Sequence, residues 1–201
     1  MTLREPHKPS FREASKDALF LILRPLVRWL SIMRVRPDTL TVIGWTLALF
    51  AAVLFGLGYA RIAGAVMLLG GLFDALDGAV ARESNRMSSF GAFLDSTLDR
   101  LSESAVFVGL IFFYASSSHP YEALLAALAM TFSLLTSYAR ARAEGLNIDC
   151  KVGLLERAGR VVILSVFSIV GLPTVGLGLL AAGALVTTAQ RILHVRRAAR
   201  G

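Results

Sequence analysis

The stretch DALDGAVARESNRMSSFGAFLDSTLD, residues 74–99, places four aspartates in one of the most apolar parts of the chain. AGAVMLLGGLF precedes it and AVFVGLIFFYA follows it. A single charged side chain at the centre of a membrane helix costs roughly 2.5–3.5 kcal/mol on insertion scales, and several carboxylates close together cost more. We therefore expect a positive charge to lie among Asp74, Asp77, Asp95 and Asp99.

The composition predicts an integral membrane protein of one domain. Of the 201 residues, 55% are hydrophobic and 17% are charged. Apolar runs near the ~20 residues that a bilayer span requires recur along the chain. The net charge of +7 is compatible with nucleic-acid binding. However, the basic residues lie between the apolar runs and at both ends, which is typical of a basic cytoplasmic face, so we expect no nucleic-acid partner.

The apolar runs predict an all-α fold with six transmembrane helices. Their expected ranges are 38–58, 62–83, 89–114, 121–143, 153–172 and 174–192. With the N-terminus in the cytoplasm, only Arg61 of the 21 Lys and Arg residues falls on the outer side. This asymmetry predicts a multi-pass protein of the cell membrane with both termini and the active site cytoplasmic.

The fifth span is unusual because its purely apolar run, residues 161–172, has only 12 residues. We expect its helix to extend back through residues 153–160, which places Glu156, Arg157 and Arg160 at headgroup depth or in a cavity.

Residues 1–36 are expected to form a cytoplasmic N-terminus with an interfacial amphipathic helix, and residues 37–201 the transmembrane domain. Arg24 and Arg28 fall four apart on one helix face, opposite an apolar side. A proline and several charges make this segment a poor span and favour a helix lying on the membrane. The alternative is that it is simply a first span.

The four aspartates form two pairs, each on one helix face. Asp74 and Asp77 are three residues apart, and Asp95 and Asp99 are four apart. Carboxylate ligands without His or Cys suit a hard cation such as Mg²⁺ or Mn²⁺. Two such ions can hold both oxygens of an in-line phosphoryl displacement. Small residues beside the aspartates leave room for a ligand or for close helix approach.

This pattern resembles the signature of the CDP-alcohol phosphatidyltransferases. It reads Asp74-x-x-Asp77-Gly78-x-x-Ala81-Arg82, eight residues, then Gly91-x-x-x-Asp95-x-x-x-Asp99. The resemblance implies a membrane enzyme in which an alcohol attacks the β-phosphorus of a CDP-linked lipid and CMP is released. It also implies that the four aspartates hold two divalent ions, Mg²⁺ or Mn²⁺, and that Asp99 takes the proton of the acceptor alcohol.

The same resemblance implies a binding site for the CDP-lipid. Gly78 would let the cytidine approach the backbone, and Arg82 would meet phosphate as a bidentate donor. PDTLT, residues 37–41, resembles another nucleotide-contacting segment of the family. The alternative for Arg82 is ordinary anchoring at the cytoplasmic face. The implied residues are Asp38, Thr41, Gly78, Ala81, Arg82, Ser88 and Gly91.

A second cluster indicates an acceptor that carries its own phosphate. The end of the fourth span, the start of the fifth and the end of the sixth carry arginines without matching acids, which favours a site for a dianionic phosphate. This part resembles the phosphatidylinositol-phosphate synthases of the family, which join inositol 1-phosphate to CDP-diacylglycerol. The implied acceptor pocket consists of Ser137, Arg140, Arg157, Arg160 and Arg191.

Two departures from those synthases bear on this pocket. They usually have Lys where this chain has Arg140, and a Pro-Glu pair where it has Ala158 and Gly159. The first departure keeps the charge but changes its geometry, and the second loosens the pocket. The alternative for the arginines is that they serve only as interfacial anchors.

The sequence therefore predicts a phospholipid-biosynthetic, metal-dependent phosphotransferase that uses CDP-diacylglycerol and inositol 1-phosphate. The nearest alternative is a phosphatidylglycerol-phosphate synthase using glycerol 3-phosphate. An ion or proton transporter is a different class, and the absence of an internal repeat argues against it. We expect contact with membrane lipids and a homodimer; small residues such as GLLAAGALV, residues 178–186, suit a dimer and packing within the chain equally.

Overall fold

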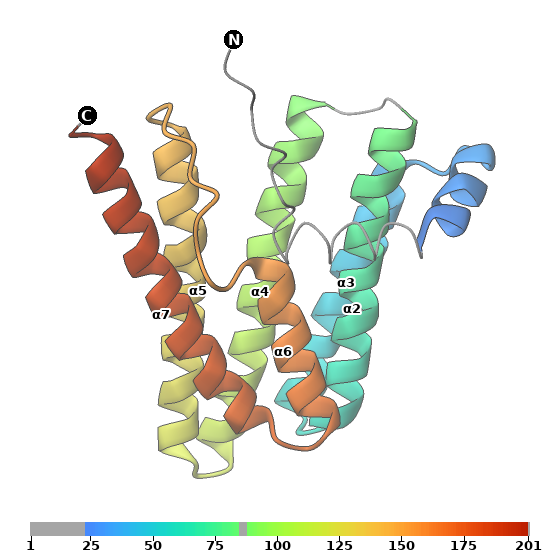
Figure 1. The fold of residues 1–201 in the computed structure, drawn as a ribbon. Helices are drawn as coiled ribbons and strands as arrows, with labels where there is room; N and C mark the ends of the chain where they lie inside the picture. The colour runs from blue at the N-terminus through green and yellow to red at the C-terminus, as the bar shows by residue number, and fades with distance from the viewer. Residues whose placement is uncertain (1–22, 85–87, 201) are drawn as a thin grey trace.

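The computed structural model describes residues 23–84 and 88–200, and every regular element in these ranges is a helix (Figure 1). The predicted all-α class is confirmed. A short helix occupies residues 23–32. The longer helices are α2 (Pro37–Gly56), α3 (Ala60–Glu83), α4 (Ser89–Ser116), α5 (Pro120–Glu144), α6 (Arg157–Ile169) and α7 (Pro173–Ala198).

Helices α2 to α7 pack in a closed ring. Helix α2 contacts α3 and α4, α3 contacts α6, α6 contacts α7, α7 contacts α5, and α5 contacts α4. The turns after α2, α4 and α6 all lie at the lower end in Figure 1, so consecutive helices are antiparallel. The opposite end carries the connection from α5 to α6 and the C-terminal end of α7, as Figure 1 shows.

Small residues let these helices approach closely. A Cβ atom on Gly109 would lie 2.2 Å from the carbonyl oxygen of Ala52, so α4 and α2 meet where no side chain fits. A Cβ atom on Gly64 would lie 2.7 Å from the carbonyl oxygen of Ser165, so α3 and α6 also approach closely. Such contacts are typical of helices packed in membranes.

Helix α6 differs from its predicted range. It has 13 residues and begins at Arg157 rather than Gly153. At 1.5 Å per residue it is about 20 Å long, shorter than the ~30 Å hydrocarbon core of a bilayer. The prediction that the helix includes residues 153–156 is wrong.

The segment before α6 is held against α7 instead of continuing the helix. The backbone N–H of Leu154 donates to Oε1 of Gln190 at 2.8 Å, and that of Leu155 donates to Oγ1 of Thr187 at 2.9 Å. Gly153 adopts φ +139°, where a Cβ atom would lie 2.4 Å from Cγ2 of Thr187. A φ of +139° is not helical, so the chain leaves the helical conformation at Gly153, and the side chains of Gln190 and Thr187 hold the next residues against α7.

Within the described residues, four helices are long and apolar enough to cross a membrane: α2, α3, α5 and α7. Helix α4 is longer, with 28 residues, but carries Asp95, Asp99, Arg100 and Glu103. Helix α6, with 13 residues, is too short to cross a bilayer by itself. These findings fit a multi-pass membrane protein, and the count of six spans stays a prediction.

The helix at residues 23–32 packs against the start of α2 and the C-terminal part of α3. Val27 is 1% exposed and lies in an apolar cluster with Leu40, Leu76 and Val80. Arg24 and Arg28 are exposed. The earlier part of the predicted amphipathic helix lies outside the described residues.

Candidate functional site

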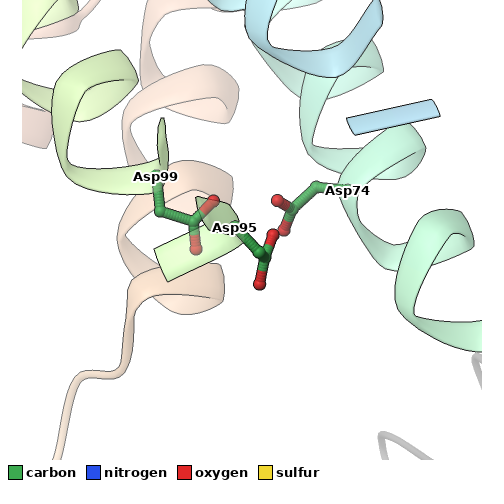
Figure 2. Close-up of side chains that lie close together, drawn as sticks. All are labelled: Asp74, Asp95 and Asp99. Atoms are coloured by element: carbon green, nitrogen blue, oxygen red, sulfur yellow. The ribbon is translucent and has the colours of Figure 1, made fainter. Parts of the chain in front are cut away.

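Three of the four aspartates of the motif lie together. Asp74 extends from α3, and Asp95 and Asp99 extend from α4 toward it (Figure 2). Each carboxylate offers an oxygen, and these oxygens lie within 4.8 Å of one another. Oxygen-only ligands at this spacing suit a hard divalent cation, so the residues present fit a metal ion.

The fourth aspartate has another partner. Oγ1 of Thr41 donates a hydrogen bond to Oδ2 of Asp77 at 2.6 Å. Asp77 is 6% exposed, so this contact satisfies a carboxylate that is otherwise buried. Thr41 belongs to the PDTLT segment at the start of α2, and the contact ties that segment to the aspartate motif.

Arg157 supplies a positive charge among the aspartates. Its Nη1 lies 2.8 Å from Oδ2 of Asp74, and its Nη2 lies 2.8 Å from Oδ1 of Asp99. Arg157 is the first residue of α6, and the attachment of the preceding residues to α7 sets where that helix begins. The sequence placed Arg157 in the acceptor pocket and missed its contact with the acid cluster.

A cavity of about 190 Å³, which we call the first cavity, opens between the starts of α2 and α4 and the end of α3. Asp77 and Asp95 form part of its wall. It is lined by all seven residues predicted to bind the CDP-lipid: Asp38, Thr41, Gly78, Ala81, Arg82, Ser88 and Gly91.

Local contacts shape this first cavity. A Cβ atom on Gly78 would lie 3.4 Å from Nη1 of Arg82, so the guanidinium lies close over the glycine. Ser88 caps helix α4, because its Oγ accepts a hydrogen bond of 2.9 Å from the backbone N–H of Gly91. Ser88 and Gly91 therefore also have a role in starting α4.

A second cavity of about 480 Å³ lies among α4, α5, α6 and α7. Asp95 lines both cavities, and Asp99 lines the second, so the acid cluster stands between them. The second cavity is lined by all five residues predicted for the acceptor pocket: Ser137, Arg140, Arg157, Arg160 and Arg191.

The expectation that these arginines lack acidic partners is wrong. Arg160 forms two hydrogen bonds with Glu103, from Nε to Oε1 at 2.6 Å and from Nη2 to Oε2 at 2.8 Å. Nε of Arg140 donates to Oε1 of Glu144 at 2.8 Å in a much more exposed pair. The spacing of Glu103, four residues after Asp99 on the same helix face, was the signal that could have found it.

Arg191 contacts backbone rather than acids. Its Nη1 donates to the carbonyl oxygen of Thr136 at 2.5 Å, and its Nε donates to that of Val152 at 3.0 Å. It thereby joins α5, α7 and the connection that leads to α6. This arrangement fixes the position of Arg191 in the cavity wall.

The model of the family described as CDP-alcohol phosphatidyltransferase matches residues 34–190. This chain belongs to that family. The match includes the aspartate motif and every residue that lines the two cavities except Arg191, so the sequence-based assignment to the family is confirmed.

Named relatives in the family are similar over most of the chain. A phosphatidylinositol phosphate synthase of Cutibacterium acnes is 35% identical over 193 residues, covering 88% of this chain and 93% of that protein. An archaetidylinositol phosphate synthase of Methanothermobacter thermautotrophicus is 40% identical over 135 residues, covering 67% of this chain and 66% of that protein.

The fold is also similar to crystal structures of the Mycobacterium tuberculosis phosphatidylinositol phosphate synthase. The form with CDP-DAG bound has a TM-score of 0.77 and 33% identity, over 85% of this chain and 92% of that chain. The form in complex with manganese and citrate has the same TM-score and identity, over 86% of this chain and 88% of that chain.

Proposed function

We propose that this member of the family is a phosphatidylinositol-phosphate synthase, which transfers the phosphatidyl group of CDP-diacylglycerol to inositol 1-phosphate and releases CMP. The observation that carries the proposal is the second cavity, where the four predicted arginines and Arg100 line a space bordered by Asp99. A set of guanidinium groups suits a dianionic phosphate, so an acceptor with its own phosphate fits this cavity. The names of the relatives agree with it.

The four aspartates of the motif would hold two divalent ions, Mg²⁺ or Mn²⁺. Asp74, Asp95 and Asp99 already lie close enough to share ligands, and Asp77 lines the neighbouring wall of the first cavity. When bound, the ions would neutralise the pyrophosphate and make its β-phosphorus a better electrophile. The manganese complex of the M. tuberculosis relative supports a divalent ion in the family.

The first cavity would bind the CDP headgroup. Gly78 leaves the backbone open to the nucleotide. The guanidinium of Arg82 lies beside Gly78 and would donate hydrogen bonds to a phosphate bound there. Asp38, Thr41 and Ser88 offer polar atoms around the same space. The CDP-DAG complex of the M. tuberculosis relative supports this assignment for the family.

The reaction would take place between the cavities. Asp99 accepts the proton of the inositol hydroxyl, whose oxygen attacks the β-phosphorus from the second cavity. The new phosphorus–oxygen bond forms as the bond to CMP breaks, and CMP leaves on the side of the first cavity. Arg157 contacts both Asp74 and Asp99 and also lines the second cavity, so it joins the acceptor side to the acid cluster.

In the membrane, we propose six spans in residues 37–201. These are the four apolar helices α2, α3, α5 and α7, together with α4 and α6. Both termini and the two cavities would face the cytoplasm, where inositol 1-phosphate and CDP-diacylglycerol meet. Residues 1–36 would form the N-terminus with the interfacial helix, consistent with exposed Arg24 and Arg28. A homodimer also stays a prediction.

The test is a CMP-release assay on purified protein with CDP-diacylglycerol and, in parallel, inositol 1-phosphate, free inositol or glycerol 3-phosphate. We expect turnover with inositol 1-phosphate and little with the other two. Equal turnover with inositol would contradict a site built for phosphate. Turnover with glycerol 3-phosphate alone would replace the proposed acceptor by the alternative one.

A further inference from the structure

Glu103 and Arg160 form an ion pair deep between α4 and α6. The exposed fraction of the side chain is 5% for Glu103 and 2% for Arg160. Two nitrogens of the guanidinium meet two oxygens of one carboxylate, at 2.6 and 2.8 Å. This bidentate geometry fixes both the position and the plane of the guanidinium.

Stability is a poor explanation for such a pair. Removing two charges from water costs several kcal/mol per ion in real proteins, and replacing a buried pair by apolar residues of similar volume is often neutral or stabilising. Helix α6 is also held in the ring by the close approach of α3 at Gly64, which needs no charges. What the pair does provide is a fixed orientation of the Arg160 side chain.

The orientation of Arg160 matters because only Arg160 lines the second cavity, while Glu103 lies behind it. Arg160 lines the second cavity, whereas Glu103 lines a small space inside the ring together with Trp45 and Ser102. Glu103 occupies Nε and Nη2 of Arg160, and no side chain in residues 23–84 or 88–200 accepts a hydrogen bond from Nη1. The donor edge at Nη1 is therefore left for a ligand in the cavity.

Glu103 also lies one helical turn beyond Asp99 on α4. A single helix thus carries the proposed base and the carboxylate that holds Arg160. The distance between the acceptor's hydroxyl and its phosphate must match the distance between Asp99 and the arginines, and a rigid helix sets that distance better than a loop would.

We propose that Glu103 is a positioning residue for the acceptor: it holds Arg160 so that the free edge of its guanidinium meets the acceptor's phosphate. This inference rests on the proposed function of the second cavity. Glu103 itself contacts neither substrate and acts through Arg160. The exposed Arg140–Glu144 pair has a different character, because solvent-exposed pairs contribute little and hold no fixed geometry.

The test is a double-mutant cycle on the KM for inositol 1-phosphate. Glu103→Gln should raise this KM about tenfold, the effect of losing one charge-assisted contact, and leave the KM for CDP-diacylglycerol unchanged. In an Arg160→Ala background the same substitution should add no further rise, because its effect passes through Arg160. Asp149→Asn is the control and should leave this KM unchanged, because Asp149 pairs with the exposed Lys151 outside the cavity lining.

A purely structural pair would behave differently. If Glu103→Gln lowered the melting temperature but left the KM for inositol 1-phosphate unchanged, or if its effect were additive with Arg160→Ala, the proposal would be overturned. Glu103→Asp gives a second measurement should the Gln variant fail to fold. It keeps the charge but draws the guanidinium back, so its KM for inositol 1-phosphate should rise, and an unchanged KM would equally overturn the proposal.

Failure of the proposed function would be visible separately, in the wild-type protein. If wild type released CMP only with glycerol 3-phosphate, the acceptor would be wrong, and the same cycle with glycerol 3-phosphate would decide the role of Glu103. If neither inositol 1-phosphate nor glycerol 3-phosphate were an acceptor, the role of Glu103 would be tested by the rise in melting temperature that inorganic phosphate causes in wild type and in Glu103→Gln. Equal protection of both proteins would overturn the proposal.

Discussion

The two cavities on either side of the acid cluster are built in different ways. The first uses residues 37–41 and a stretch of the motif from Asp77 to Asp95, mostly small residues and one arginine. The second collects side chains from four helices, and its five arginines, Arg100 among them, all have partners within the protein. The first cavity provides space near the backbone, and the second provides charge that is already oriented at Arg157, Arg160 and Arg191.

This difference has a consequence for binding. A cavity of small residues gains affinity from close contact, so a ligand must fit its shape. A cavity of oriented guanidinium groups gains affinity from charge. The conformational entropy of these arginine side chains is already lost on folding, so binding does not lose it again. We therefore expect substitutions in the two cavities to affect different substrates, and substitutions between them to affect turnover itself.

The largest expected effect comes from metal removal, which acts on the cluster that both cavities share. Excess EDTA should abolish CMP release, and Mg²⁺ or Mn²⁺ added beyond the chelator should restore it, because the clustered carboxylates would otherwise repel the pyrophosphate. The measurement is CMP release with and without added ion. Full activity in excess EDTA would contradict a metal-dependent reaction.

The next largest effect should come from Asp99→Asn. Loss of a general base lowers the rate by roughly 10²–10⁴, so kcat should fall by about this factor. Binding of CDP-diacylglycerol, measured directly, should fall much less because three acids and Arg82 remain. Asp149→Asn is the control, since Asp149 pairs with Lys151 on the exposed connection. A retained rate in Asp99→Asn would place the base elsewhere.

Arg157→Ala tests the second cavity. A charge-assisted contact is worth roughly 1.5–3 kcal/mol, about tenfold to hundredfold in affinity, and the KM for inositol 1-phosphate should rise by that factor. The KM for CDP-diacylglycerol should stay nearly unchanged. Arg142→Ala is the matched control, because Arg142 is exposed and lies outside the cavity lining. Lower expression with both KM values unaltered would indicate an anchoring arginine instead.

Arg82→Ala tests the first cavity and should give the smallest effect. Arg82 is exposed, so its contact with phosphate is weakened by water, and we expect a rise of about threefold to tenfold in the KM for CDP-diacylglycerol. The KM for inositol 1-phosphate should not change. If Arg82→Ala raised only the KM for CDP-diacylglycerol and Arg157→Ala only that for inositol 1-phosphate, each cavity would serve one substrate. If both variants raised both KM values, this division between the cavities would be wrong.

All seven residues that the family resemblance implied for the CDP-lipid line the first cavity, because the motif and the PDTLT segment that carry the resemblance also form its wall. The aspartates and small residues recur at helical spacing, and the segment at Pro37 marks the start of α2. Helices α2 to α5 lie within a few residues of their predicted ranges, since long apolar runs ended by Pro, Gly or charged residues define them.

The second cavity was predicted only in part, because its contacts depend on the tertiary arrangement. The arginines were identified, but Glu103 as the partner of Arg160 and Asp74 as a partner of Arg157 were not. The start of α6 was also misplaced. Hydropathy cannot show that Gln190 and Thr187, more than thirty residues downstream, take the backbone hydrogen bonds of Leu154 and Leu155.

The short helix α6 has a consequence for how the chain enters the membrane during synthesis. A helix of 13 residues with two arginines at its start is too short and too polar to insert by itself. Helix α7 follows after a tight turn, and its side chains hold the segment that leads into α6. We expect α6 and α7 to integrate together as a helical hairpin, so a chain that stops at residue 172 should leave α6 accessible to proteases added on the side of the membrane where α5 ends.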